Sequence, residues 1–160
     1  MSQKNLSLAL KAVVIGLGLI GAALTFFLLP LYGREIAEEF PEFSGAYLPW
    51  LLFVIVFSLP CFAALFFGWK IAKNIGLDRS FTKENAGFLK IIAFLAVGDA
   101  AFFFVTNWVF AAFSINFPAM LVLVTPLVTF VGVAAAVVFF ALSHLIYKAA
   151  LLREDADLTI

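Results

Sequence analysis

The stretch 43–69, FSGAYLPWLLFVIVFSLPCFAALFFGW, decides the fold, because about 27 consecutive residues in it carry no charge. A helix of about 20 apolar residues is long enough to cross the hydrocarbon core of a bilayer. A second uncharged run of about 22 residues covers 12–33. A third run begins near Phe88, is interrupted only by Lys90 and Asp99, and continues through Tyr147. Its length is sufficient for two further crossings.

The composition of the whole chain agrees with these runs. Of its 160 residues, 65% are hydrophobic and 12% are charged, and the mean hydropathy is +1.14. Soluble domains are nearer half apolar and a quarter charged, and a domain of this size cannot bury such a surplus in one core. Lipid must therefore solvate most of the surface. The formal net charge of zero gives no reason to expect nucleic-acid binding, and the single cysteine, Cys61, excludes a disulfide framework.

Each crossing must satisfy its own backbone hydrogen bonds, which only helices and closed barrels achieve in lipid. Continuous apolar runs without strict alternation exclude the barrel. We therefore predict an all-α fold, an integral membrane bundle of four transmembrane helices in a single domain of residues 1–160. The predicted helices cover about 8–32, 46–69, 83–113 and 119–150, with a turn at 114–118, a cytoplasmic loop at 70–82 and a cytoplasmic tail at 151–160 that is too short to fold alone.

Basic residues predict the orientation of the bundle. Arg34 stands alone at one end of the predicted helices, beside four glutamates. The other nine basic residues fall at the opposite end: Lys4, Lys11, Lys70, Lys73, Arg79, Lys83, Lys90, Lys148 and Arg153. Because cytoplasmic segments carry the excess of Lys and Arg, we predict that both termini are cytoplasmic.

The first apolar run contains a motif associated with nucleotide binding. Gly16, Gly18 and Gly21 match G-x-G-x-x-G letter for letter. A dinucleotide site needs a strand, an exposed loop and an amphipathic helix within an α/β sheet, whereas an apolar sequence with no polar face follows here. We interpret the glycines as part of a membrane helix that a neighbouring helix approaches closely. No catalytic constellation or metal-ligand cluster is evident, and we predict no cofactor.

Asp99 is a charged residue inside the third run. It lies about nine residues past Lys90, roughly 14 Å along a helix axis, which places it near the bilayer midplane. An ionised carboxylate at that depth costs on the order of 3 kcal/mol or more unless it is paired or hydrated. Thr106 and Asn107 follow at i+7 and i+8, so we predict an intramembrane polar site formed by these three residues. The site either stabilises the packing of the four helices, or makes a polar contact with the membrane helix of a partner, or binds a proton, a cation or a ligand. Candidate hydrogen-bond donors to Asp99 are Ser58, Thr25 and Thr129.

Two short motifs resemble a bacterial family, the domain of unknown function 2975. The first is the F-T-x-E-N run formed by Phe81, Thr82, Glu84 and Asn85. The second is an acidic stretch that closes in Asp157, Leu158, Thr159 and Ile160. The resemblance implies a small four-helix protein of the bacterial cytoplasmic membrane, with no established biochemical activity. It also implies a gene that commonly lies beside a small Cro/CI-like helix-turn-helix regulator. Relatives often carry basic residues after the first motif, where Ala86 and Gly87 stand here.

These features predict a non-enzymatic regulatory or sensor protein. Its loop and tail are expected to bind a cytoplasmic helix-turn-helix transcription regulator through the eight motif residues, while the chain itself does not bind nucleic acid. Thr82 is the predicted N-cap of the third helix, and Glu84 suits the positive end of its dipole. Leu158 and Ile160 could enter a groove on the partner, although a tail folded on the basic loop or a solvated end fits the same residues.

Two alternatives use the membrane-embedded part of the chain. One is a small transporter or channel subunit, in which Asp99 binds the substrate and Thr106 and Asn107 line its path. A pore of this kind would require a homo-oligomer. The other is an assembly subunit of a larger membrane complex, which would co-purify with a membrane-embedded partner.

Overall fold

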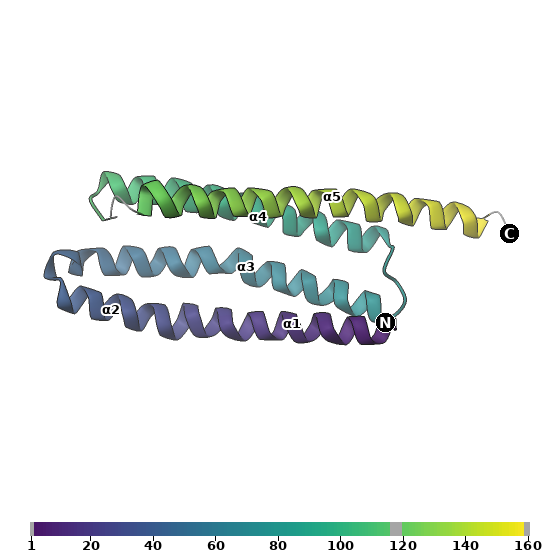
Figure 1. The fold of residues 1–160 in the computed structure, drawn as a ribbon, viewed down its shortest axis with the longest axis horizontal. Helices are drawn as coiled ribbons and strands as arrows, with labels where there is room; N and C mark the ends of the chain where they lie inside the picture. Colours follow the sequence, from purple (N-terminus) through teal and green to yellow (C-terminus); the bar gives the residue numbers. More distant parts are fainter. Residues whose placement is uncertain (1, 116–119, 159–160) are drawn as a thin grey trace.

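The computed structural model describes residues 2–115 and 120–158, and within these residues it contains helices but no strand (Figure 1). Four continuous helical segments are long and apolar enough to cross a membrane, which confirms the predicted fold class. Their elements, in chain order, are α1 (Gln3–Ala23), the π-helical η1 (Leu24–Leu28), α2 (Leu29–Glu39), the 3-10 helix η2 (Pro41–Ala46), α3 (Tyr47–Gly76), α4 (Lys83–Ala112), the π-helical η3 (Met120–Val124) and α5 (Thr125–Leu158).

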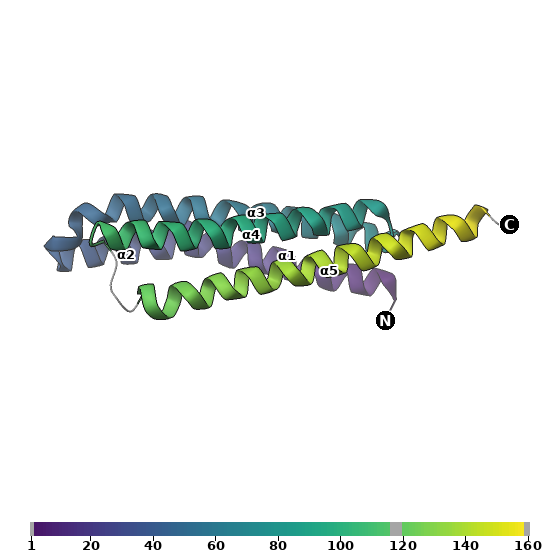
Figure 2. The same cartoon turned by 90° about the horizontal axis from the view of Figure 1, so that it is seen from above.

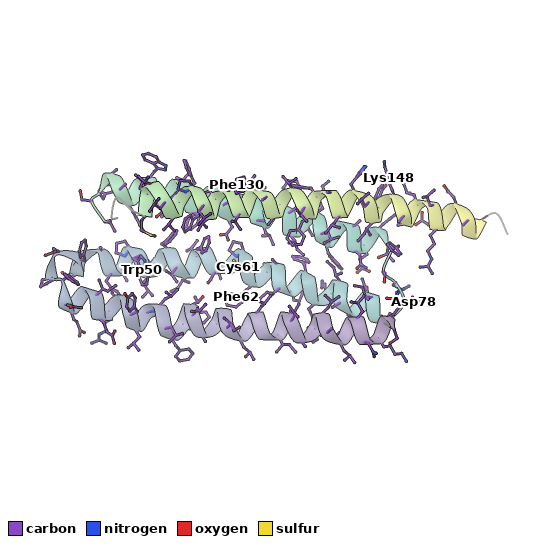
Figure 3. All side chains as sticks on the ribbon, in the orientation of Figure 1. Trp50, Cys61, Phe62, Asp78, Phe130 and Lys148 are labelled. Carbon is purple, nitrogen blue, oxygen red and sulfur yellow. The ribbon has the colours of Figure 1, made fainter. Side chains whose placement is uncertain are left out.

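The helices form two antiparallel hairpins that lie in two layers (Figures 1 and 2). One layer pairs α1 with α3, the other pairs α4 with α5, and the contact between α3 and α4 joins them. Among the described residues, no Cα atom of α1 lies within 8 Å of a Cα atom of α4 or α5. Trp50 marks one end of the bundle, and Asp78 marks the end at which both termini lie (Figures 1 and 3). That this second end is cytoplasmic stays a prediction from charge.

Helix α4 is the centre of the bundle because it packs against both α3 and α5. One series of its buried side chains recurs every seven residues, at Ala86, Ala93, Ala100 and Asn107. Phe103 and Phe110 repeat the same spacing beside it. On α5 the same spacing relates the buried residues Ala136, Ser143 and Ala150. A seven-residue repeat keeps one seam facing a neighbouring helix, and small residues in that seam let the two backbones come close. We call this contact the α4–α5 seam.

Three of the helices are longer than predicted. The first was expected at 8–32 and runs from Gln3 to Glu39, and the fourth was expected to end at 150 but continues to Leu158. The second was expected to end at 69 but α3 continues to Gly76, so the connecting loop is 77–82 rather than 70–82. The prediction ended these helices where charged residues begin. A helix that already exists adds further residues without a new nucleation cost, however, and the Arg34–Glu38 ion pair at 2.9 Å supports the extension in the first helix. The tail expected at 151–160 is therefore helical over its described residues.

Both π-helical segments precede a proline. Segment η1 ends just before Pro30, and η3 ends just before Pro126. A proline lacks an N–H group and its ring clashes with the carbonyl group one turn earlier, so a widened turn relieves the clash. The fully buried Thr125 donates from Oγ1 to the carbonyl oxygen of Met120 at 2.9 Å, which satisfies one acceptor of that turn. The prolines thus shape the helices without interrupting them.

The closest helix approaches do not occur at the G-x-G-x-x-G run. A Cβ atom placed on Gly16 would meet no atom within 4 Å, and one on Gly21 would make an ordinary contact of 3.6 Å with Phe62. At Gly132 in the α4–α5 seam, by contrast, a Cβ atom would lie only 2.9 Å from Cβ of Ala100. The run does lie in a helix, as expected, but the close approach predicted there is wrong for Gly16, whose neighbourhood is open.

Candidate functional site

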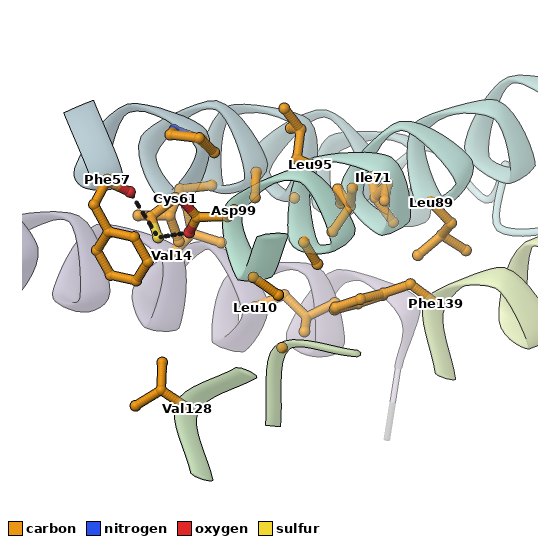
Figure 4. Close-up of a pocket in the computed structure, with 18 residues that line it drawn as sticks. Leu10, Val14, Phe57, Cys61, Ile71, Leu89, Leu95, Asp99, Val128 and Phe139 are labelled. Atoms are coloured by element: carbon orange, nitrogen blue, oxygen red, sulfur yellow. Dashed lines mark hydrogen bonds between the residues drawn. The ribbon is translucent and has the colours of Figure 1, made fainter. Parts of the chain in front are cut away.

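Asp99 lies on α4 in the wall of a cavity of about 400 Å³ to which all four membrane-spanning helices contribute (Figure 4). Leu10 and Val14 of α1 and Val128 of α5 belong to the same wall, which is almost entirely hydrocarbon. No Cα atom of α1 lies within 8 Å of a Cα atom of α5 in the described structure, so the backbones of these two helices are not closely packed beside this cavity. The cavity therefore places one carboxyl group in an otherwise apolar space within the membrane-spanning region.

The nearest polar partner of Asp99 is a thiol that the sequence analysis did not connect with it. Cys61 on α3 donates from Sγ to Oδ2 of Asp99 at 3.5 Å, and the same sulfur lies 3.8 Å from the carbonyl oxygen of Phe57 (Figure 4). A thiol is a weak donor. The other carboxylate oxygen, Oδ1, is buried and has no hydrogen-bond partner in the described part of the chain. Asp99 is thus an incompletely satisfied carboxyl group, which is costly in an apolar environment.

The donors expected for Asp99 are used elsewhere or remain apart from it. Ser58 donates to the carbonyl oxygen of Ile55 at 2.7 Å, within its own helix. The Thr129 hydroxyl is buried and makes no hydrogen bond in the described structure, and Thr25 is buried near the middle of the first span. No described side chain therefore gives Asp99 a strong hydrogen bond.

Thr106 and Asn107 share a face of α4 with Asp99 but do not join it in one cavity. Seven residues of helix correspond to about 10 Å along the axis, so a shared face does not bring the side chains together. Asn107 is buried in the seam and donates from Nδ2 to the carbonyl oxygen of Phe103 at 2.8 Å. Neither residue lines the cavity beside Asp99. The structure therefore pairs Asp99 with Cys61 and places the other two residues in the packing of α4.

A second polar cluster fixes the connection between α3 and α4, and Asn85 is its centre. This side chain is fully buried, and its Nδ2 donates to the carbonyl oxygens of Arg79 at 2.9 Å and Ser80 at 3.0 Å. Its Oδ1 accepts a hydrogen bond of 2.8 Å from Nδ2 of Asn74. The backbone N–H of Asn85 donates to Oγ1 of Thr82 at 3.2 Å, which makes Thr82 the N-cap of α4, as predicted.

The end of α3 completes this cluster. Asp78 adopts a left-handed conformation with φ of 59°, and its N–H group donates to the carbonyl oxygen of Ile75 at 3.1 Å. The N–H group of Arg79 donates to the carbonyl oxygen of Asn74 at 2.9 Å, which is the Schellman pattern of a helix C-terminus. Glu84 also accepts from Nδ2 of Asn74 at 3.2 Å. The F-T-x-E-N run thus holds the loop in shape, while the side chain of Phe81 is exposed.

The C-terminal end of α5 extends beyond the neighbouring helix ends (Figures 1 and 2). Lys83, the first residue of α4, forms an ion pair with Glu154 at 2.6 Å. Asp157 and Leu158 lie in the helix, whereas Thr159 and Ile160 fall outside the described residues. Of the four predicted tail residues, two are therefore placed on a helix that is tied to the start of α4.

Comparison with known proteins supports the resemblance seen in the two motifs. The family model described as "Protein of unknown function (DUF2975)" matches residues 31–160. The chain belongs to this family. The DUF2975 match includes the F-T-x-E-N run, Asp99 and the C-terminal residues.

A curated relative extends the comparison over nearly the whole chain. The uncharacterized membrane protein YoaS of Bacillus subtilis (strain 168) is 26% identical over 154 residues, which cover 94% of this chain and 95% of YoaS. No solved structure matches the chain. This DUF2975 member is therefore a multi-pass membrane protein from a family of unknown function.

Proposed function

We propose that the protein is a non-enzymatic regulatory component of the cytoplasmic membrane that binds a helix-turn-helix transcription regulator. The binding surface is the loop-end face, which we define as the loop 77–82 together with residues 151–158 of α5. One observation carries the proposal. Helix α5 continues past its neighbours as a charged helix (Figure 1), and an exposed Lys83–Glu154 ion pair at 2.6 Å joins it to the start of α4.

The loop-end face has the composition of a protein-binding surface. Leu77, Phe81 and Leu152 are each more than half exposed, although they stand among charged residues rather than in an apolar span. Exposed apolar side chains with a charged rim are typical of interaction sites, and a projecting helix with exposed leucines can enter a groove on a partner. The charges around them are Arg79, Lys83, Arg153, Glu154 and Asp155.

The hydrogen bonds of Asn85 add a further argument. They hold the loop in one conformation before any partner arrives, so binding need not order it. Nine of the ten basic residues lie at this end of the bundle, which supports its assignment to the cytoplasm, where a transcription regulator would be found. The resemblance to the family supplies the class of partner. A regulator held on the loop-end face would be kept away from DNA.

The proposal is tested by purifying the tagged full-length protein in mild detergent from its bacterial host and identifying co-purifying proteins by mass spectrometry. A variant lacking residues 153–160 should lose a small helix-turn-helix protein, because the deletion removes Glu154 and the end of α5. The matched control is Lys73→Gln, which changes an exposed basic residue at the same end and should retain the regulator. Equal recovery with the deletion variant would refute binding through the tail, and absence of such a protein from every sample would refute the regulatory role.

The Asp99 cavity supports transport as a second candidate function. Intramembrane carboxyl groups commonly mark ion or substrate pathways, and Asp99 faces a cavity of about 400 Å³ without a strong hydrogen-bond donor. This hypothesis predicts that Asp99→Asn abolishes substrate flux in reconstituted vesicles while the loop-end face still binds its partner. Unchanged flux would contradict it.

A further inference from the structure

A cleft between α4 and α5 lies at the loop end of the bundle, on the membrane side of the Lys83–Glu154 ion pair. Its volume is about 510 Å³. Lys83 and Lys90 of α4 and His144 and Tyr147 of α5 provide its polar wall, together with Ser143. Gly87 also lines the cleft, and a Cβ atom placed there would meet nothing within 4 Å, so this part of the wall is open. None of the lining residues is acidic.

The position of the cleft along α4 matches the headgroup layer of a bilayer. Lys83 begins the helix and Lys90 follows seven residues later, so their Cα atoms lie about 10 Å apart along the axis. The headgroup layer of one leaflet is about 5–8 Å thick. Lys83 can therefore lie in water while the Lys90 stem rests on the hydrocarbon and its ammonium group reaches the headgroups.

The cleft retains hydrogen-bonding capacity for an anion. Lys83 is paired with Glu154, whereas Lys90 forms no ion pair with an acidic side chain in the described part of the chain. An ammonium group has three donors, and Lys83 uses one of them on Glu154. An imidazole donates in either protonation state, which adds His144. Ser143 does not add a donor, because its hydroxyl already donates to the carbonyl oxygen of Ala86 at 2.7 Å.

We propose that this cleft binds a phosphate group, and that the phosphate is the phosphodiester of an anionic membrane lipid. Clustered ammonium and N–H donors form a site for phosphate oxygens, and at this cleft Glu154 is paired with Lys83 while Lys90 has no acidic partner among the described residues. Basic pockets between transmembrane helices bind lipid headgroups. Phe140 lines the cleft and packs edge-on against Phe94 at a ring-centroid distance of 5.0 Å, and Phe94 is largely exposed. These rings provide an apolar surface for an acyl chain, which a free phosphate would not use. The inference does not depend on the regulator proposed above.

The test measures lipid retention by native mass spectrometry of the full-length protein in mild detergent. Phosphatidylglycerol is added to one sample and phosphatidylcholine with the same acyl chains to another. The wild-type protein should retain phosphatidylglycerol in preference, and the double variant Lys83→Gln/Lys90→Gln should lose this preference by roughly fivefold for each lysine removed. The control Lys4→Gln/Lys73→Gln removes the same charge from exposed positions outside the cleft at the same end and should keep it.

Three results would overturn the proposal. Equal retention of the two lipids by the wild-type protein would exclude selectivity for an anionic lipid, and equal losses in the two double variants would show attraction to overall charge rather than to the cleft. Displacement of the lipid by millimolar inorganic phosphate, with loss of binding in Lys83→Gln/Lys90→Gln, would assign the cleft to free phosphate instead. The variant Lys83→Arg/Lys90→Arg keeps the charge and should retain the lipid, which separates loss of binding from loss of fold.

Discussion

Asn85 and Asp99 lie roughly four turns apart on α4, yet the protein satisfies them very differently. The Asn85 side chain is fully buried, and both its amide donors and its oxygen have partners between 2.8 and 3.0 Å away. Asp99 receives one thiol contact at 3.5 Å, and its Oδ1 has no hydrogen-bond partner among the described residues. The first arrangement holds two helices and a loop together, whereas the second leaves a polar atom beside a cavity.

The difference separates a satisfied polar group from an incompletely satisfied one. A buried hydrogen-bond network stabilises a fold only when its members are satisfied, and leaving one partner unsatisfied costs more than the bond itself contributes. Asn85 meets this condition, whereas Asp99 in the apolar part of the bundle does not. The contrast therefore predicts that Asn85 contributes more to the stability of the fold than Asp99 does.

Replacing Asn85 should have the largest effect on stability. The Asn85→Ala change removes three side-chain hydrogen bonds and leaves the carbonyl groups of Arg79 and Ser80 without their donor. We expect the free energy of unfolding in detergent to fall by about 3 kcal/mol. Circular dichroism during denaturant titration measures the change. The control Glu84→Gln alters a neighbouring residue that accepts one hydrogen bond of 3.2 Å, and it should lower the free energy of unfolding much less. Similar decreases for both variants would show that Asn85 is not the main stabilising residue of this cluster.

Asn107 tests whether hydrogen bonding, rather than burial alone, distinguishes the two classes of polar residue. It is as buried as Asn85, but the carbonyl oxygen of Phe103 lies on its own helix at 2.8 Å. We expect Asn107→Leu to lower the free energy of unfolding by about 1–2 kcal/mol, because it removes the hydrogen bond to Phe103 and disturbs the α4–α5 seam. The same titration measures it. A loss larger than that of Asn85→Ala would reverse the proposed order.

The smallest change in stability is expected at Asp99, although it carries a charge. Asp99→Asn removes a group whose ionised form is poorly solvated, so the free energy of unfolding should stay constant or rise by up to about 2 kcal/mol. The Asn107→Leu variant on the same helix provides the comparison. A decrease of more than about 1 kcal/mol in Asp99→Asn would show instead that Asp99 locks the bundle.

Local sequence patterns predicted the spans and the start of α4, since long uncharged runs and a Thr N-cap act within one segment. Thr82 could be identified for this reason, because its hydrogen bond reaches only three residues along the chain. The helix ends at Glu39 and Leu158 were missed because charge was taken as the limit of each helix. A signal for the α4–α5 seam was present in the sequence, since small residues recur every seven positions at Ala86, Ala93 and Ala100.

The contact between Asp99 and Cys61 could not be predicted in the same way. It joins residues 38 positions apart on different helices, and its formation depends on the rotation of α3 and α4 about their axes. Uniformly apolar spans leave that rotation undetermined, because no polar face marks the side toward the neighbour. For the same reason, the sequence motif predicted a close helix approach at Gly16 and gave no indication of one at Gly132. In the structure a side chain at position 132 would collide with Ala100 in the α4–α5 seam.

The distribution of the helix-turn-helix regulator between membrane and soluble fractions is the most direct test of binding at the loop-end face. Cells would contain either the full-length protein or the variant lacking residues 153–160, and the regulator would be quantified after sedimentation of the membranes. We expect the regulator to sediment with membranes containing the full-length protein and to become soluble with the truncated one. A regulator that remains soluble in both strains would contradict binding at the loop-end face.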